Sequence, residues 1–360
     1  MSSIKYIGIT FGADPELFVS KDGEIIGAEK VIPKEGLVAH EDRGNVIIDG
    51  VQAEINVQPD TCRQGFSRNL SACFRELHAA LEGSKTQANF SQTVVVSPDE
   101  MKTLDPASQQ FGCSPSENAY GESKLSIKDA SKYYARSAGG HLHLGFGYEE
   151  SVKILQNHAH TVQILDILLG NTCVLIDRDP GNVARRKVYG KAGEYRTPQH
   201  GLEYRTLSNF WLRSYQLTSF VLALARFSVA VAGDEKVSQQ ILAAVNMDDI
   251  RRAINENDFD LAYQNFNAIK DIVKDIDANV NKSPYYGTVF PLEGHRVEQF
   301  EFFASKGLDH WFKEDPMTHW LREDRTHGWE NFLGGIVAPQ MTKEPQKEVV
   351  VEKTLAEAIA

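Results

Sequence analysis

Pairs of polar side chains two residues apart are the feature of this sequence that most constrains its fold. Four short segments contain such a pair: Asp14 and Glu16, Glu54 and Asn56, His141 and His143, and Glu203 and Arg205. The residue between the two is apolar, aromatic or proline in every case. Because side chains two apart on a β-strand point to the same face, these segments predict strands with one polar face. Charged groups crowded on such a face must be paired or must bind a metal ion.

The spacing of apolar residues along the chain predicts an α+β fold. Short apolar runs bounded by turn residues predict strands, and Asp49-Gly50 between two such runs predicts a hairpin. Longer segments have the apolar spacing of a helix face. The expected strands cover 4–10, 24–32, 46–57, 92–96, 139–146 and 201–207, and the expected helices cover 65–83, 151–174, 211–231, 247–254 and 259–276. Strands that pair locally, with helices inserted between them, favour a mainly antiparallel sheet.

The chain divides by composition into three parts. Residues 1–233 contain all the polar pairs and are expected to form the core that holds the candidate site. Residues 234–340 have short, charged, amphipathic segments, including two expected helices within 297–323, and are predicted to form a helical region packed on the core. Residues 341–360 lack glycine and aromatic residues and are rich in Lys and Glu, which predicts a disordered, solvated tail.

Charge and cysteine usage narrow the classes of function. The chain has 38 Lys and Arg against 49 Asp and Glu, and this net charge of −11 argues against direct nucleic-acid binding. Its four cysteines lie far apart without a CxxC pair, which argues against a thiol zinc site or a disulfide framework and fits a cytoplasmic protein. The apolar stretch 217–231 is short and interrupted by polar residues, and the first residues lack a signal-peptide pattern. We therefore expect no membrane association.

The segment 185–196 is a candidate for gripping phosphate. It has five cationic residues and two glycines in an otherwise acidic chain, and guanidinium groups can bind phosphate oxygens in bidentate fashion. The chain has neither a GxGxxG after a strand nor a P-loop, so a nucleotide would have to be held in another way. An acidic metal cluster beside a basic loop is what magnesium–ATP chemistry requires.

Each motif also has a purely structural interpretation. Asp14 and Glu16 flank a proline and fit a turn, Glu54 fits an edge-strand charge, and Glu203 and Arg205 fit an exposed cross-strand charge pair. The basic segment fits a solvated loop. His141 and His143, set between glycines, are the hardest pair to explain without a ligand or a metal.

Taken in order, these segments resemble the phage-type carboxylate–amine ligases (amidoligases), within the glutamine-synthetase and glutamate–cysteine-ligase superfamily. The resemblance covers roughly residues 7–215. It rests on Phe11-Gly12-Ala13-Asp14-Pro15-Glu16, Glu54-Ile55-Asn56, Phe111-Gly112-Cys113, Gly139-Gly140-His141-Leu142-His143-Leu144-Gly145 and Gly201-Leu202-Glu203-Tyr204-Arg205. The sequence departs from the family after Phe111-Gly112-Cys113, where a more acidic stretch is expected than Ser114-Pro115-Ser116-Glu117-Asn118.

The resemblance implies a curved antiparallel sheet of the glutamine synthetase type, with helices on its convex face and a concave face that binds ATP and two or more Mg²⁺ ions. It implies the following roles: Glu16, Glu54, His141 and Glu203 as metal ligands; His143 and Arg196 near the ATP phosphates; Arg205 on the phosphoryl or carboxylate group; and either Arg185 or Arg186 as a further phosphate contact. Asp14 and Glu16 are both candidates for the base that deprotonates the amine.

The function expected from the resemblance is amide-bond formation between a small-molecule or peptide carboxylate and an amine. ATP would convert the carboxylate to an acyl phosphate, which the amine then attacks. The alternatives are a guanidino or amine phosphotransferase on the same sheet, a zinc hydrolase that uses His141 and His143, and a non-enzymatic interaction protein. The sequence selects neither the substrates nor the oligomeric state, and it is compatible with an oligomer.

Overall fold

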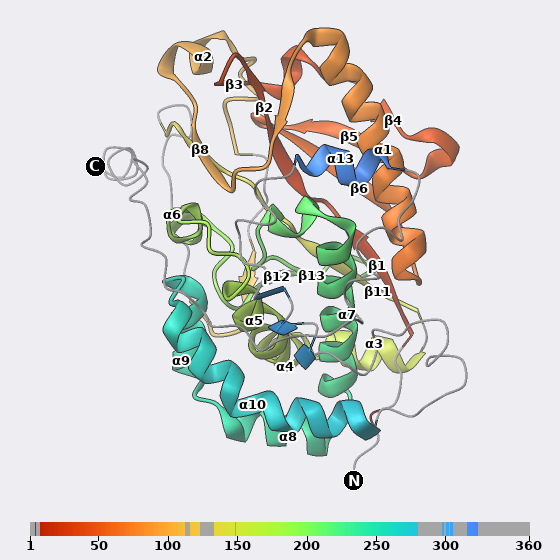
Figure 1. Cartoon of the computed structure of the whole chain (residues 1–360), viewed down its shortest axis with the longest axis vertical. Helices are drawn as coiled ribbons and strands as arrows, with labels where there is room; N and C mark the ends of the chain where they lie inside the picture. Colours follow the sequence, from red (N-terminus) through yellow and green to blue (C-terminus); the bar gives the residue numbers. More distant parts are fainter. Residues whose placement is uncertain are drawn as a thin grey trace.

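A computed structural model describes most of the chain (Figure 1). The described residues are 4, 8–111, 116–122, 133–147, 149–279, 297–298, 300–301, 303–304 and 315–322. The predicted tail at 341–360 lies outside them, as do Gly112 and Cys113.

Most strands join one antiparallel sheet, which confirms the predicted α+β class. Its main path runs β3–β2–β6–β1–β11–β13–β12–β9; β4 and β5 extend it beside β6, β7 pairs with β2, and β8 and β10 form a separate pair. The strands are β1 Ile9–Ala13, β2 Glu16–Lys21, β3 Glu24–Ile26, β4 Leu37–Val38, β5 Gly44–Asp49, β6 Gln52–Asp60, β7 Gln87–Asn89, β8 Thr93–Val95, β9 Glu117–Asn118, β10 Ala135–Ser137, β11 Leu142–Phe146, β12 Glu194–Arg196 and β13 Gly201–Tyr204.

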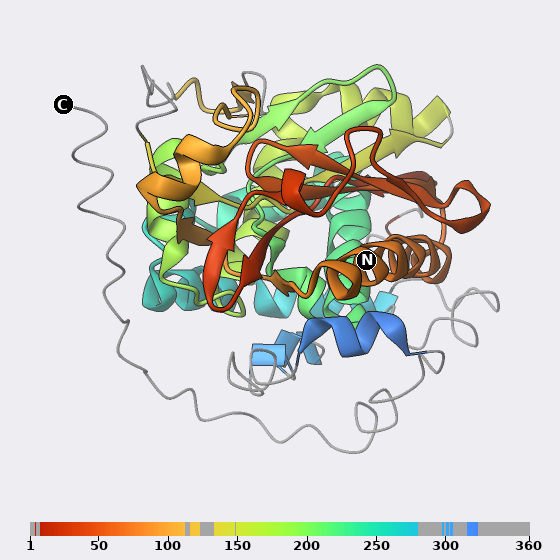
Figure 2. The same ribbon diagram turned by 90° about the horizontal axis from the view of Figure 1, so that it is seen from above.

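Along the strands, apolar residues alternate with the polar pairs, and these apolar residues form the core between the sheet and the helices. Ile55, Leu144 and Tyr204 alternate with the polar pairs along β6, β11 and β13, and all three are fully buried. Helix α1 (Arg63–Ser84) packs against β5 and β6, and α3 (Glu149–Gln156) packs against β11 and β13. Figure 2 shows α1 on one side of the N-terminal strands. The polar residues of those strands therefore face away from the helices.

The single helix predicted over 151–174 is broken in the structure. It consists of α3, α4 (His158–Leu165), a π-helical turn (Asp166–Gly170) and α5 (Asn171–Val174). Asn157 interrupts the helix between α3 and α4 with a ψ of 62°. The buried carboxylate of Asp166, described below, stands at the start of the π-turn.

The remaining helices surround this core. They are α2 (Pro98–Thr103), α6 (Gly181–Val188), α7 (Tyr215–Ala232), α8 (Glu235–Ala244), α9 (Met247–Asn255), α10 (Phe259–Asn279) and α13 (Pro316–Leu321). Helices α8, α9 and α10 begin after residue 233 and contact α7 and α5 (Figure 1). The helices expected at 247–254 and 259–276 are confirmed. Of the segment 297–323, α13 is a described helix, and most of the rest lies outside the described residues. The proposed division into domains stays a prediction.

Helix α7 is long and apolar enough to span a bilayer, but it lies inside the fold. Of its 18-residue window, 89% is buried within the protein. Its contacts with α1, α3, α4 and α8 show that it packs against helices on several sides. A core helix enclosed in this way is expected to be apolar all round.

Trp320 attaches α13 to the rest of the protein. Its ring is 2% exposed and stacks on Phe74 of α1 with a centroid distance of 5.2 Å and an interplanar angle of 15°. Its indole N–H donates to the Leu212 carbonyl at 2.6 Å, and its own carbonyl accepts a hydrogen bond from Ser71 at 2.5 Å. One side chain thus links α13 to both α1 and the segment before α7.

We predict that Trp320→Ala lowers the free energy of unfolding by about 3–5 kcal/mol, because it leaves a cavity and an unpaired buried carbonyl. Urea denaturation of the full chain measures this loss. Tyr263→Ala is the matched control: that ring is 41% exposed, and its removal should cost less than about 1 kcal/mol. Equal losses in the two variants would contradict the docking role of Trp320.

Candidate functional site

The strand register brings the four predicted polar pairs together on one face of the sheet. Glu16 pairs directly with Glu54 across β2 and β6, and His143 pairs with Glu203 across β11 and β13. Glu203 also pairs with Arg196 on β12. Directly paired residues of antiparallel strands point to the same face, so side chains distant in the sequence converge.

Asp14 joins the two imidazoles into a group that we call the histidine cluster: Asp14, His141, His143 and Glu203. Its carboxylate oxygens lie 3.2 Å from His141 Nδ1 and 3.2 Å from His143 Nε2. His141 Nδ1 is also 3.7 Å from Glu203 Oε1. Asp14 stands at the junction of β1 and β2, where Pro15 removes a backbone donor, rather than in an exposed turn.

Two arginines hold the Glu203 carboxylate. Arg196 donates to both of its oxygens at 2.6 Å, and Arg205, whose side chain is fully buried, donates to Oε1. Burial alone would raise the pKa of Glu203, but the hydrogen bonds from Arg196 and the charge of Arg205 bring it below the ordinary value. Glu203 is therefore ionised and paired, which excludes the exposed cross-strand pair considered above.

A second group, which we call the carboxylate cluster, consists of Glu16, Asp49 and Glu54. One oxygen from each lies within 4.8 Å of the others. Burial, and after it the negative charge of Asp49, raises the pKa of Glu16 to about 7. Burial, and after it the negative charge of Asp14, raises the pKa of Glu54 to about 9. Three carboxylates this close repel one another as anions and become mutually stable when a cation joins them.

The environment of Glu16 fixes its orientation. Its Oε2 accepts hydrogen bonds from the Gly139 N–H at 2.8 Å, the Tyr189 hydroxyl at 3.1 Å and the Gln52 amide at 3.3 Å. These three donors come from separate parts of the chain and leave Oε1 of Glu16 for the cluster. The side chain is only 4% exposed.

Both clusters could hold a hard cation, and the histidine cluster also leaves buried polar atoms unsatisfied. Asp14 Oδ1, both ring nitrogens of His141 and His143 Nε2 are buried atoms without a hydrogen bond of good geometry. Carboxylate oxygens with an adjoining imidazole are ligands suited to Mg²⁺ or Mn²⁺. The predicted ligands fall into two groups: Glu16 and Glu54 lie in the carboxylate cluster, and His141 and Glu203 lie in the histidine cluster.

Sequence reasoning missed Asp49, which was assigned only to the hairpin turn. The register of the β5–β6 hairpin pairs Asp49 with Gln52 and Ile47 with Glu54. Asp49 therefore shares a face with Glu54. The signal was present in the sequence, because a two-residue turn at 50–51 places residues 49, 52 and 54 on one side.

His200 and Tyr189 were also missed, and no spacing rule would have found them. His200 stacks on His143 with ring centroids 5.2 Å apart, and its Nε2 lies 3.0 Å from His143 Nδ1. The Tyr189 hydroxyl reaches Glu16, and its ring lies edge-on to His141. Both come from connections between elements, whose positions the tertiary fold sets.

Arg185 and Arg186 do not face the clusters, which corrects the expectation of a phosphate contact. Residues 185–188 belong to α6, so the predicted basic loop is confined to 189–193 between α6 and β12. Arg185 is fully buried and donates to the carbonyls of Arg205, Thr206 and Leu207. Arg186 is 4% exposed and donates to Asn257 at 3.1 Å. The Arg185 guanidinium therefore holds backbone carbonyls, and the Arg186 guanidinium holds the Asn257 side chain.

A buried carboxylate supports β13 from the opposite face. Asp166 is fully buried and accepts hydrogen bonds from the hydroxyls of Tyr204 at 2.6 Å and Tyr120 at 2.8 Å, with Thr206 at 3.4 Å. Tyr204 stands between Glu203 and Arg205 in the sequence, so the bond fixes β13 directly behind the site. Burial raises the pKa of Asp166 to about 7.

A sheet face with two acidic clusters and adjoining guanidinium groups is the arrangement that the resemblance to carboxylate–amine ligases implies. Residues 120–290 match the sequence model of the family described as "Phage phiEco32-like COOH.NH2 ligase-type 2". This confirms the resemblance seen in the motifs, over a segment that contains His141, His143, Glu203 and Arg205 and begins after Glu54. The family description names a carboxylate–amine ligase.

No curated protein matches the chain. Among solved structures, one described as "Crystal structure of novel glutamine synthase homolog" matches 81% of this chain and 70% of its own, with 11% sequence identity and a TM-score of 0.33. That likeness transfers no residue roles to this chain.

We predict that Asp166 makes the protein less stable as the pH rises. Its pKa is higher in the folded protein than in the unfolded chain, so the folded state binds the proton more tightly, and this stability is lost as the pH rises through about 7. Asp166→Asn should flatten the fall in the free energy of unfolding between pH 5 and 8, by an amount on the order of 2–4 kcal/mol. Urea denaturation at several pH values measures it.

The matched control for this prediction is Asp248→Asn, since the Asp248 side chain on α9 is 82% exposed. That variant should keep the pH dependence of the wild type. If Asp166→Asn keeps it as well, Asp166 is not the titrating group.

Proposed function

We propose that the protein is an ATP- and Mg²⁺-dependent ligase that joins a carboxylate to an amine through an acyl-phosphate intermediate. The family match supports the class of reaction. The observation that supports the ATP-dependent form is that the two acidic clusters share one sheet face with the guanidinium groups of Arg196 and Arg205, which pair with Glu203 of the histidine cluster. Phosphoryl transfer needs both kinds of group, because charge must be neutralised on several oxygens at once.

Glu16, Asp49 and Glu54 would hold one cation, and Asp14, His143 and Glu203 would hold another. Bound there, Mg²⁺ would offset the negative charge of the phosphate oxygens. His141 adds a buried imidazole beside the second group. Burial and the charge of Arg205 lower its pKa to about 4, so it is neutral and can act as a ligand.

Asp14 acts as a residue that orients the imidazoles rather than as the base. Both of its oxygens face imidazole nitrogens, and Arg196 lies 3.8 Å from Oδ2. Burial alone would raise the pKa of Asp14, but His141 and His143 hold it well below the ordinary value, which makes its carboxylate a poor proton acceptor. Asp14 is therefore set aside as the base, and Glu16, which we assign to the cation, is not assigned that role as well.

Arg196 and Arg205 differ in how freely they can engage a substrate. The Arg205 side chain is fully buried, whereas that of Arg196 is 28% exposed. We assign Arg196 to phosphate oxygens of the nucleotide, and Arg205 to orienting Glu203 and to a group of the substrate that enters the site. We also assign to these phosphates His200, whose Nε2 lies 3.0 Å from His143 Nδ1.

We expect the substrates to be a small-molecule or peptide carboxylate and an amine. A guanidino or amine phosphotransferase remains the alternative for the same face, and the products distinguish the two. The ligase releases ADP and free phosphate together with an amide, whereas the phosphotransferase leaves the phosphoryl group on the amine. A zinc hydrolase would act without ATP.

We predict that a non-hydrolysable ATP analogue binds in the presence of Mg²⁺ and not in EDTA, and that Arg196→Gln weakens the binding at least tenfold. The variant removes a charged donor to phosphate but leaves Glu203 paired with Arg205, so the fold is retained. Calorimetric titration measures both effects. Arg252→Gln, on the half-exposed surface of α9, should bind as the wild type does.

Analogue binding that is insensitive to EDTA and to Arg196→Gln would remove the nucleotide from this site. The zinc hydrolase and interaction-protein alternatives would then take precedence.

We predict that Mg²⁺ raises the melting temperature of the wild type and that Glu54→Gln removes this gain. The same variant should raise the melting temperature in EDTA by up to a few degrees, because the folded protein must keep Glu54 protonated without a cation and glutamine does not have that cost. Differential scanning calorimetry of the wild type and of Glu54→Gln, each in Mg²⁺ and in EDTA, measures both changes in melting temperature. Glu150→Gln on the exposed end of α3 is the control. An unchanged Mg²⁺ gain in Glu54→Gln would exclude the carboxylate cluster as a cation site.

A further inference from the structure

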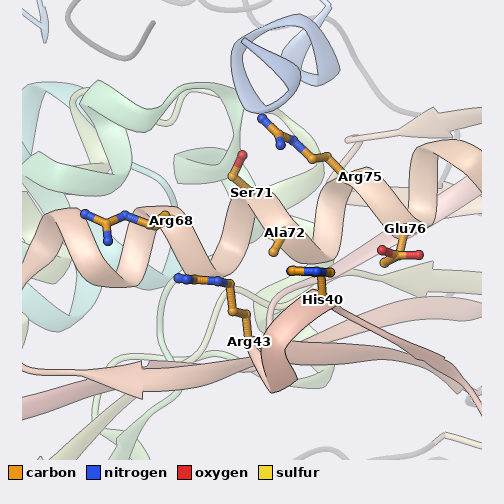
Figure 3. A pocket seen from close by; sticks show the side chains of 7 residues that line it. All are labelled: His40, Arg43, Arg68, Ser71, Ala72, Arg75 and Glu76. Carbon is orange, nitrogen blue, oxygen red and sulfur yellow. The ribbon is translucent and has the colours of Figure 1, made fainter. Parts of the chain in front are cut away.

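A cavity of about 280 Å³ lies on the opposite side of the molecule from the clusters' sheet face, between α1 and the turn at 40–43. We call it the arginine pocket. Figure 3 shows the residues that line it: His40, Arg43, Arg68, Ser71, Ala72, Arg75 and Glu76. Helix α1 packs its apolar face against β5 and β6, so the pocket is formed on the helix side of the sheet.

The lining is strongly basic in a chain whose net charge is −11. Ser71, Ala72 and Arg75 follow Arg68 by three, four and seven residues. This spacing places all four side chains along one face of α1. Arg43 approaches from the neighbouring segment, and its guanidinium extends beneath α1 towards the Arg68 end of the helix (Figure 3). Glu76 is the single acid among the lining residues.

Arg68 and Arg75 lack the partners that arginines on a protein surface commonly have. Within the part of the chain that the structure describes, neither has an ion pair or a hydrogen bond from its guanidinium group. By contrast, Arg43 is held by Glu41 and by Asn69 Oδ1 at 3.1 Å. Because Arg43 is paired with Glu41, the positive charge comes from Arg68 and Arg75, and it exceeds the single negative charge of Glu76 among the lining residues.

The backbone beside Arg43 is held in an unusual conformation. Glu41 and Asp42 are consecutive non-glycine residues with φ of 57° and 51°. Such left-handed residues cost on the order of 1 kcal/mol each and persist only where the surroundings impose them. The Arg43 N–H groups bond to Glu41 Oε2, and the Arg43 carbonyl accepts from the Gln58 N–H at 3.0 Å. The turn therefore presents Arg43 in a fixed position.

We propose that the arginine pocket binds a small multivalent anion that bears phosphate or carboxylate groups. Guanidinium groups recognise both by bidentate hydrogen bonds, and the volume admits a ligand of metabolite size rather than a polymer. Glu76 stands at the rim, where it can accept from a hydroxyl or ammonium group of the ligand and disfavours additional anionic groups. The site is separate from the proposed ATP site and does not depend on that function.

Calorimetric titration of the full chain at low salt with inorganic phosphate, and separately with citrate, tests the proposal. We expect saturable binding of at least one of the two probes, and the one that binds identifies the anionic group. Arg68→Gln/Arg75→Gln should weaken that binding at least tenfold, and Glu76→Gln should tighten it. Both Arg68 and Arg75 are exposed, so the double variant should melt as the wild type does.

The matched control is Lys21→Gln/Lys236→Gln, which removes the same charge from exposed positions on β2 and α8 and should bind the probe as the wild type does. Equal weakening in both double variants would mean a general charge effect and would overturn the proposal. Binding that is lost in Arg196→Gln but kept in Arg68→Gln/Arg75→Gln would place the anion at the ATP site and would also overturn it. So would the absence of binding for both probes.

Discussion

Repulsion among carboxylates gathered on one sheet face is the constraint on which the rest of the site depends. Asp14, Glu16, Asp49, Glu54 and Glu203 all point to that face, and hydrophobic burial alone would oppose their ionisation. The protein treats them in two ways. Arginines and imidazoles neutralise Glu203 and Asp14, whereas the carboxylate cluster has no cationic side chain bonded to it among the described residues. That difference leaves the negative charge of the carboxylate cluster uncompensated, which is why we propose it as a cation site.

The opposite face of the same strands stabilises this arrangement. Tyr204 lies between Glu203 and Arg205, and its hydroxyl bonds to the buried Asp166 at the π-helical turn. Arg185 donates to the carbonyls that follow β13. The strand is therefore fixed by Asp166 through Tyr204 and by Arg185 just beyond its end. Buried hydrogen-bonded networks of this kind hold catalytic side chains to a narrow range of positions. Among the described residues, the helices thus support the candidate site from behind the sheet.

The chain has two basic features, the segment 185–196 and the arginines of α1. Composition suggests that the segment 185–196 is the one available to an anion, and the structure shows that most of its guanidinium groups are already bonded within the protein. The run of cations at 185–196 is divided between a buried helix end and a strand. On the helix, Arg185 bonds to backbone carbonyls and Arg186 bonds to Asn257. On the strand, Arg196 reaches the acidic site. The excess of positive charge lies instead on α1, in a stretch of ordinary composition. A count of cations along the sequence therefore does not reveal which guanidinium groups are available to a ligand.

The sequence by itself determined the strands with polar pairs, the hairpin at Asp49-Gly50 and the separation of polar from apolar faces, because alternation with a period of two is a local property. Most of the candidate ligands, including His141 and Glu203, could be named on that basis. Only the tertiary structure decided which strands are neighbours, and so which carboxylates share a cluster. It also decided that Arg185 and Arg186 are buried and that Asn157 and Asp166 interrupt a helix. These depend on long-range packing and desolvation, which no local spacing of residues encodes.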